Sequence, residues 1–421
     1  MEGTEIMIKV KPFRAVRPAN DLAAHVAAHA YDVVSREEAR RLVHDNPYSF
    51  LRVEKSEINL PDSVDPYSDV VYESARDTLQ AMMEGGVMIR DEAPFFYIYQ
   101  QRMGDHIQNG IVACVDVKDY VEGRIKRHEM TRADKELDRI RHIDRVNAQT
   151  GPVFLAYRRN RSIDSIIDRI VEKTDPECRF TADDGTSHSV WIVRDDADME
   201  QIKREFASVD SLYIADGHHR AAAAAGVAER RRKSNQRITG EEGFDGIMAV
   251  IFAHDQLQIF PYNRVVKDLA GVTEEAFLDR LSEDFIVEES KSGVSPRQKG
   301  SFGLYLPGRW YGMILKDAKD SIPGGRVSSL DVSILQDRVL GPVLKLVDVR
   351  SDERIDFVGG TRGISELERL VDSGDFAVAF SLHPVDMESL MAVSDSGQVM
   401  PPKSTWFEPK LKSGLFVHFL D

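Results

Sequence analysis

The feature that most constrains the fold is an apolar stretch that runs directly into a tight turn and then into a long helix. Leu212 to Ala215 has the pattern of a short apolar strand, and Asp216-Gly217 follows it. The segment from Arg220 to Arg232 contains five consecutive alanines and predicts a strong helix. Glycine tolerates a positive φ and lets the backbone approach a ligand closely. We therefore expect a strand–turn–helix unit with Gly217 at its turn.

The same turn carries the most specific candidate site. The first amide N–H groups of a helix lack partners inside the helix and form a natural binding site for phosphate. His218, His219 and Arg220 add side-chain donors there, and an exposed Arg220 would bind phosphate through two hydrogen bonds. Asp216 is expected to hold Mg²⁺ or to orient a histidine. The alternative is a structural turn in which Asp216 caps the helix and both histidines lie on the surface.

A second candidate segment is Arg127-His128-Glu129, which precedes a highly charged helix. Thr131 and Asp134 have the spacing of a capping box at the start of that helix. Such a density of charge is usually a solvated, salt-bridged surface. Glu129 beside His128 is nevertheless a candidate general base. We assign Arg127 and His128 to substrate binding.

The third candidate segment is the proline-stiffened run from Met400 to Lys410. It carries Lys403, Ser404 and Thr405, which are candidate substrate-binding residues in a loop that closes over the site. The alternative is a rigid connection into the last strand.

Charge and composition exclude several classes of protein. The chain has 421 residues and a net charge of −15, which disfavours non-specific binding of nucleic acid. It has two cysteines, no segment long enough to cross a membrane and no apolar signal sequence in its first ten residues. It also lacks the glycine-rich motifs of phosphate loops and dinucleotide-binding folds. We expect a cytoplasmic protein that binds a small molecule, neither nucleic acid nor membrane, and we leave homo-oligomerisation open.

Helices and strands alternate irregularly along the chain, which predicts an α+β fold rather than repeated βαβ units. Ser35 and Glu38 form a capping box at a helix start. Ile247 to Phe260 has the pattern of a hairpin that turns at His254-Asp255. The pattern changes near residue 265, which predicts an N-terminal and central region over residues 1–265 and a C-terminal α+β domain over residues 266–421.

Several of these segments resemble an uncharacterised bacterial family, the domain of unknown function 1015 proteins, and the resemblance covers nearly the whole chain. The segments that carry it are Asn46-Pro47-Tyr48-Ser49-Phe50, Arg127-His128-Glu129, residues 147–154, Asp216–Arg220, Pro261-Tyr262-Asn263-Arg264 and residues 400–411.

The Asp216–Arg220 segment alone also resembles the phosphate-binding box of the ParB and sulfiredoxin superfamily. It is most similar to the free-serine kinases of that superfamily, which move a phosphoryl group from a nucleotide to serine. This resemblance implies a ParB/sulfiredoxin-like mixed sheet domain with additional α/β segments. Sulfiredoxins carry a catalytic cysteine where this chain has His218, so their activity is not implied.

The combined expectation is an enzyme that uses ATP or ADP with Mg²⁺ to phosphorylate a small hydroxyl substrate such as free serine. In this hypothesis Gly217, His218, His219 and Arg220 bind the nucleotide, Asp216 and His218 take part in catalysis, and Asp216 holds the metal. Glu129 accepts the hydroxyl proton. Apart from this proton transfer, phosphoryl transfer depends mainly on positioning and charge neutralisation. The alternatives are a non-catalytic nucleotide- or metabolite-binding regulator and a phosphoester hydrolase.

Overall fold

The computed structural model describes residues 7–234, 239, 242–316 and 325–421, and its contacts divide them into two compact units. Unit 1 contains the described residues up to Arg127, Thr131–Leu257 and Pro409–Asp421. Unit 2 contains His128–Met130 and Gln258–Glu408. This division differs from the predicted boundary at residue 265, because unit 2 already begins at Gln258 and the C-terminal segment returns to unit 1.

Unit 1 is built on a mixed sheet, nine-stranded over the described residues, with the order β6-β11-β8-β12-β5-β4-β10-β9 and with β1 also paired to β5. The pairs β12–β8 and β11–β6 are parallel, and the other pairs are antiparallel. This confirms the predicted combination of helices with a mixed sheet. The strands are β1 (Val10–Lys11), β4 (Phe96–Met103), β5 (His106–Asp116), β6 (Ile125–Lys126), β8 (Val153–Tyr157), β9 (Cys178–Thr181), β10 (Ser187–Val193), β11 (Leu212–Asp216) and β12 (Gly246–Ala253).

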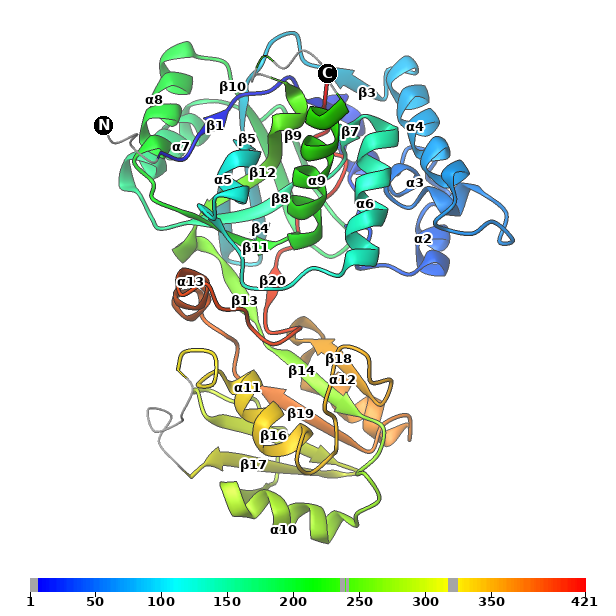
Figure 1. Ribbon diagram of the computed structural model, residues 1–421, viewed down its shortest axis with the longest axis vertical. Helices are drawn as coiled ribbons and strands as arrows, with labels where there is room; N and C mark the ends of the chain where they lie inside the picture. The colour runs from blue at the N-terminus through cyan, green and yellow to red at the C-terminus, as the bar shows by residue number, and fades with distance from the viewer. Residues whose placement is uncertain (1–6, 235–238, 240–241, 317–324) are drawn as a thin grey trace. The chain divides into compact units, whose positions relative to one another are not determined.

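Helices pack against this sheet and supply much of the core of unit 1. The long helices α6 and α9 lie side by side (Figure 1). Apolar side chains of α7, α8 and α9 meet those of the central strands in one buried cluster. The helices of unit 1 are α1 (Ala23–Val26), α2 (Arg36–Leu42), α3 (Leu51–Glu54), α4 (Asp69–Glu84), α5 (Val117–Val121), α6 (Ala133–Val146), α7 (Arg161–Lys173), α8 (Asp196–Ala207) and α9 (His218–Ser234).

The two predicted capping boxes have different outcomes. The Ser35 side chain accepts a hydrogen bond from the Glu38 amide and caps α2, as predicted. The box at Thr131 is wrong, because α6 begins at Ala133 and the Thr131 hydroxyl donates to the Glu136 side chain instead.

The predicted hairpin over Ile247 to Phe260 is also wrong. Strand β12 pairs with β5 on one edge and with β8 on the other, so neither edge is open to the next segment. Strand β13 (Gln258–Phe260) pairs with β20 (Trp406–Glu408) within unit 2. A sequence pattern shows that both segments are extended, but it does not show which edges are already occupied.

Unit 2 contains a six-stranded antiparallel sheet among the residues described, in the order β15-β17-β16-β19-β14-β18. Its strands are β14 (Tyr262–Val266), β15 (Phe285–Ser290), β16 (Ser301–Leu306), β17 (Arg309–Leu315), β18 (Ile355–Gly359) and β19 (Val378–Leu382). Its helices are α10 (Glu274–Asp284), α11 (Asp331–Leu335), α12 (Gly363–Asp372) and α13 (Met387–Asp395), and a short π-helix spans Gln336–Leu340.

The C-terminal segment, red in Figure 1, runs back through unit 1 and is fixed there by backbone hydrogen bonds. Ser413 bridges to Ala28, and Val417 bridges to Val16 in β2 (Val16–Pro18), which itself pairs with β3 (Met88–Arg90). Strand β21 (His418–Phe419) pairs with β7 (Ala148–Gln149). Because this segment crosses unit 1, it brings Lys410 and Ser413 to the start of α9.

Of the helices in the described ranges, none combines the length and apolar character needed to cross a membrane.

Candidate functional site

The predicted strand–turn–helix unit is present, with Gly217 between β11 and α9. Gly217 has a φ of +87°, in the left-handed region that glycine tolerates best. A Cβ atom at Gly217 would meet no atom closer than 3.5 Å, so the backbone angle rather than the available space requires glycine. The Ala221 amide donates to the Gly217 carbonyl at 3.1 Å and begins the hydrogen bonds of the helix. The amides before Ala221 lie in the first turn, where a helix offers no carbonyl to them.

Asp216 is held in place by two donors. Its Oδ1 accepts the Gly217 amide at 2.8 Å, and its Oδ2 accepts the Lys410 ammonium at 2.7 Å. Desolvation raises the pKa of Asp216, but Lys410 outweighs it and, with the Gly217 amide, brings this pKa to about 2. The side chain remains 42% exposed. Each carboxylate oxygen keeps a second lone pair, but the positive charge of Lys410 at Oδ2 repels a divalent cation, so Asp216 fits a magnesium ion poorly while this ion pair is in place.

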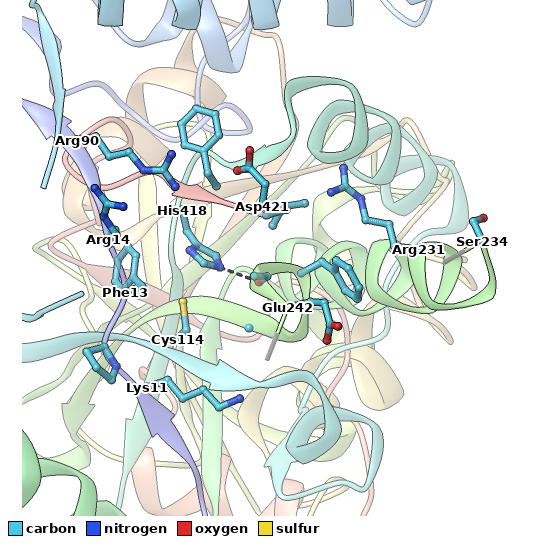
Figure 2. Close-up of a pocket in the computed structure, with 16 residues that line it drawn as sticks. Lys11, Phe13, Arg14, Arg90, Cys114, Arg231, Ser234, Glu242, His418 and Asp421 are labelled. Carbon is cyan, nitrogen blue, oxygen red and sulfur yellow. Dashed lines mark hydrogen bonds between the residues drawn. The ribbon is translucent and has the colours of Figure 1, made fainter. Parts of the chain in front are cut away.

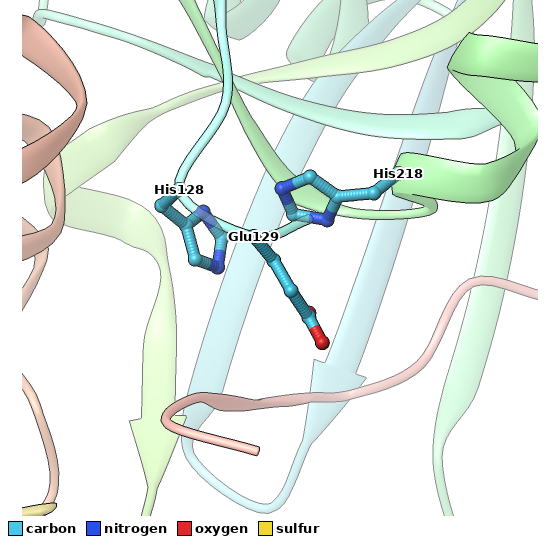
Figure 3. A group of neighbouring side chains, drawn as sticks. All are labelled: His128, Glu129 and His218. Atoms are coloured by element: carbon cyan, nitrogen blue, oxygen red, sulfur yellow. The ribbon is translucent and has the colours of Figure 1, made fainter. Parts of the chain in front are cut away.

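The Asp216–Arg220 segment is called the box from here on. Its two histidines differ in their environment. His218, at the start of α9 (Figure 3), is 4% exposed, so it is not the surface side chain that a purely structural turn would present. The Nε2 atom of His219 accepts the backbone amide of Arg132 at 3.0 Å, so its proton is on Nδ1. Burial lowers the pKa of His219, which keeps the ring neutral at physiological pH. His219 therefore offers one N–H donor rather than two.

Arg220 is not exposed at the helix start, and that expectation is wrong. Its side chain is 13% exposed and forms two parallel hydrogen bonds with Glu54, of 3.3 Å and 2.9 Å, while the Glu54 side chain is completely buried. Thr150 donates to Glu54 at 2.5 Å, and Arg220 also donates to Ser413 at 3.3 Å. A Cβ atom at Gly151 would lie 2.4 Å from the guanidinium, so glycine is needed there. The guanidinium thus fixes the start of α9 to α3 and to the C-terminal segment.

Aromatic and acidic groups complete the surroundings of Arg220. Tyr31 lies under two guanidinium groups, with its ring centre 5.1 Å from Arg220 and 4.1 Å from Arg139. Burial, and then the nearby Asp32 carboxylate, raise the pKa of Tyr31 to about 12, so its hydroxyl stays protonated. The exposed Asp32 also acts electrostatically on His219 and Arg220. Asp32 was not among the predicted site residues, because no local sequence pattern links it to the Asp216–Arg220 segment.

The Arg127-His128-Glu129 segment follows β6, and Figure 3 shows the side chains of His128 and Glu129. Arg127 is exposed and lies over the ring of Tyr120. By its contacts, His128–Met130 belongs to unit 2, although Arg127 and Thr131 on either side belong to unit 1.

Within unit 2, His128 meets the segment that begins at Met400. The buried His128 ring lies 3.3 Å from the Thr405 hydroxyl, and the Met400 amide donates to the His128 carbonyl at 2.7 Å. The structure therefore brings together two of the candidate substrate-binding residues, His128 and Thr405.

Lys403 and Ser404 have structural contacts in the same segment. The backbone of Lys403 has a φ of +57°, and its carbonyl accepts Arg264 at 2.9 Å. Ser404 is 6% exposed and donates to the Pro401 carbonyl at 2.6 Å. The lysine of this motif that reaches the Asp216–Arg220 segment is Lys410, which was not among the predicted site residues.

Comparison with solved structures finds weak similarities over about three quarters of the chain. A conserved hypothetical protein from Pyrococcus furiosus has 14% identity and a TM-score of 0.35, and the match covers 73% of this chain and 95% of that one. A free serine kinase variant in complex with ADP has 15% identity and a TM-score of 0.36, with 72% and 92% covered. C-terminally truncated SbnI from Staphylococcus aureus has 10% identity and a TM-score of 0.39, with 73% and 87% covered.

No curated protein gives a significant match to the chain. A family model described as "Protein of unknown function (DUF1015)" matches residues 10–333, which include the box, the Arg127-His128-Glu129 segment and most of unit 1. The chain therefore belongs to the DUF1015 family, as its sequence motifs predicted.

Proposed function

We propose that the start of α9 binds the phosphate groups of a nucleotide, and that the protein transfers a phosphoryl group to a small hydroxyl substrate such as free serine. The observation that carries this proposal is the turn itself. Gly217 takes a left-handed conformation at the end of β11, opens a 17-residue helix and lies beside the Asp216–Lys410 ion pair. A helix start of this kind combines amide donors with the positive end of the helix dipole.

In this proposal, the phosphate groups accept hydrogen bonds from the first amides of α9, from the Nδ1–H of His219 and from Lys410. Arg220 contributes by holding the helix start on Glu54 rather than by binding phosphate with a free guanidinium. The backbone dipoles at the start of α9 neutralise the phosphate charge only in part, and the Lys410 ammonium adds a positive charge. Its charge-assisted hydrogen bonds contribute about 1.5–3 kcal/mol each.

The chemistry requires few groups. The hydroxyl oxygen of the acceptor forms a bond to phosphorus while the bond between phosphorus and the leaving nucleotide oxygen breaks, and the hydroxyl proton passes to a base. We retain Glu129 as the proposed base, with His218 as a catalytic partner and His128 and Thr405 on the substrate side. Mg²⁺, when bound with the nucleotide, would neutralise phosphate charge, and Asp216 would hold it more readily after releasing the Lys410 ammonium.

One observation favours a second candidate function, a regulator that binds a nucleotide without turnover. The Lys410 ammonium lies 2.7 Å from Asp216 Oδ2, so the protein itself places a cation beside the carboxylate that was predicted to hold Mg²⁺. A site of that kind is complete for binding an anion without a metal.

The test is product analysis by phosphorus NMR after incubation of the protein with ATP or ADP, Mg²⁺ and free serine. We expect phosphoserine to form in equal amount to the nucleotide consumed, and Glu129→Gln to stop this reaction while nucleotide binding persists. If the protein binds nucleotide but phosphorylates no small alcohol, the proposal of a kinase is wrong and that of a regulator is favoured. Release of inorganic phosphate without an acceptor would make the protein a hydrolase.

A further inference from the structure

Unit 1 contains a cavity of about 780 Å³ that takes no part in the function proposed above. It opens near the C-terminal end of α9, where Arg231 and Ser234 line it (Figure 2). The box lies at the other end of this 17-residue helix. At 1.5 Å per residue, the two ends are about 25 Å apart, so the cavity and the box are separate sites. The volume lies in the range that small-molecule ligands occupy.

The charged lining of the cavity is mainly basic, although the chain as a whole carries −15. Four cations and two carboxylates line it: Lys11, Arg14, Arg90 and Arg231 against Glu242 and Asp421. A cation that already has an acidic partner in the protein adds little to the binding of an anion. The partners of the four cations therefore show which of them could bind a ligand.

Two of the four cations are already neutralised by the protein. Arg231 donates to the side chains of Asp144 and Asn147, and the Lys11 ammonium lies 3.8 Å from Asp116. These two groups shape the cavity but have little positive charge left for a ligand.

The other two cations, Arg14 and Arg90, form no ion pair with any residue that the structure describes. Arg14 donates through Nε to the Asp91 backbone carbonyl, which leaves the two outer nitrogens of its guanidinium for a ligand. The Arg90 guanidinium lies 5.5 Å from the centre of the Phe419 ring. Both side chains are exposed and border the same cavity (Figure 2). Two unpaired guanidinium groups at one cavity fit a carboxylate, sulfonate or phosphate group, which each can bind through two hydrogen bonds.

The remaining lining is apolar and aromatic. Phe13, Phe244 and Phe419 face the cavity, and Phe13 packs edge-on against His418 with ring centres 5.3 Å apart. The His418 Nε2–H donates to the Gly243 carbonyl at 2.8 Å, which fixes the ring in place. Phe13 and Phe244 are 4% and 5% exposed and Phe419 is half-buried, so the rings give the cavity an apolar wall of small exposed area against which a planar group can pack.

We propose that this cavity binds an organic anion in which a planar apolar group is joined to an acidic group. The acidic group lies on Arg14 and Arg90, and the planar group lies against the phenylalanines. The proposal does not depend on the function assigned to the box.

The test is a fluorescence titration with anilinonaphthalene sulfonate, a planar sulfonate whose emission rises in apolar surroundings. We expect saturable binding at one site per chain, weakened about tenfold by Arg14→Gln and by Arg90→Gln. The neutral compound N-phenylnaphthylamine should bind the native protein more weakly than the sulfonate, and this preference should vanish in the double variant. Arg204→Gln, on the exposed surface of α8 away from the cavity, is the matched control and should leave the affinity unchanged.

Two further measurements separate this cavity from the box and from loss of folding. Lys410→Gln should not alter the affinity for the probe, and the thermal unfolding midpoints of the two cavity variants should equal that of the native protein. Equal affinity of the native protein and the double variant for the sulfonate would overturn the proposal. So would a loss of probe affinity in Lys410→Gln as large as in the cavity variants.

Discussion

Arg220 and Glu54, which are 166 positions apart in the sequence, form a buried ion pair with two parallel hydrogen bonds of 3.3 Å and 2.9 Å. The pair joins the first turn of α9 to the end of α3. Burial raises the pKa of Glu54, but the charge and hydrogen bonds of Arg220 outweigh it and lower this pKa to about 2. The carboxylate is therefore ionised at any physiological pH, and the geometry of the box depends on it.

Removal of the Glu54 charge should destabilise unit 1 strongly. Glu54→Gln keeps the shape of the side chain but leaves the Arg220 guanidinium buried without a counterion, which costs about 3–5 kcal/mol of unfolding free energy. Urea unfolding followed by circular dichroism measures this loss. Glu229→Gln, on the exposed face of α9, is the control and should not shift the midpoint. Equal midpoints for Glu54→Gln and this control would show that the pair contributes nothing to stability.

The same ion pair predicts how stability depends on pH. The pKa of Glu54 is lower in the folded protein than its ordinary value of 4.5, so the folded state binds fewer protons than the unfolded state in this range. The contribution of ionised Glu54 to the free energy of unfolding is complete above about pH 5 and is lost as the pH falls from about 4.5 toward 2. Urea midpoints at pH 6, 4.5 and 3 should fall steeply for the native protein.

Burial lowers the pKa of His142 to about 4. The unfolded state therefore binds this proton first as the pH falls, which also destabilises the fold. The Glu54 charge also raises the pKa of His142, so the comparison that isolates Glu54 is the difference between His142→Gln and the double variant Glu54→Gln/His142→Gln. That difference should shrink as pH falls below 4.5, and a difference that stays constant down to pH 3 would contradict the account.

The turn at Gly217 can be tested with a matched glycine. Gly217→Ala forces a side chain into a left-handed backbone conformation, at a cost of about 1–2 kcal/mol, and should also weaken nucleotide binding because the first amides of α9 shift. Gly104 has a φ of +60° in the turn between β4 and β5, with no atom near the position of its Cβ. Gly104→Ala should lose similar stability and retain nucleotide binding. If the two variants bind ADP equally, the turn has no role in binding.

Local sequence was sufficient to predict the turn at Gly217, the helix that follows it and the α+β class, whereas the mixed sheet was expected only from the family resemblance. Local sequence could not predict that the Arg220 side chain is buried, because this burial depends on Glu54 and Ser413, which come from distant parts of the chain. For the same reason Lys410 was missed: its role follows from the return of the C-terminal segment into unit 1. The hairpin at residue 254 failed because strand pairing depends on which sheet edges are open, and periodicity carries no such information.

Lys410 and a magnesium ion should compete for Asp216. In Lys410→Gln, Oδ2 of Asp216 loses its ammonium partner and becomes available to a hard cation. We therefore expect Mg²⁺ to strengthen ADP binding more in Lys410→Gln than in the native protein. Calorimetric titrations of ADP with and without Mg²⁺ measure the difference. The double variant Asp216→Asn/Lys410→Gln should lose the added effect of Mg²⁺, and an unchanged effect would mean that Asp216 does not bind the ion.

The central claim, that the start of α9 binds nucleotide phosphate, is tested most directly by titration calorimetry with ADP in the absence of Mg²⁺. The native protein should bind ADP, and Lys410→Gln should bind it about tenfold more weakly, since it loses a charged donor worth about 1.5 kcal/mol and exposes the charge of Asp216 to the phosphates. Lys203→Gln, on the surface of α8, should bind ADP like the native protein. Failure of the native protein to bind ADP, ATP or pyrophosphate, or equal affinities in all three proteins, would contradict the account.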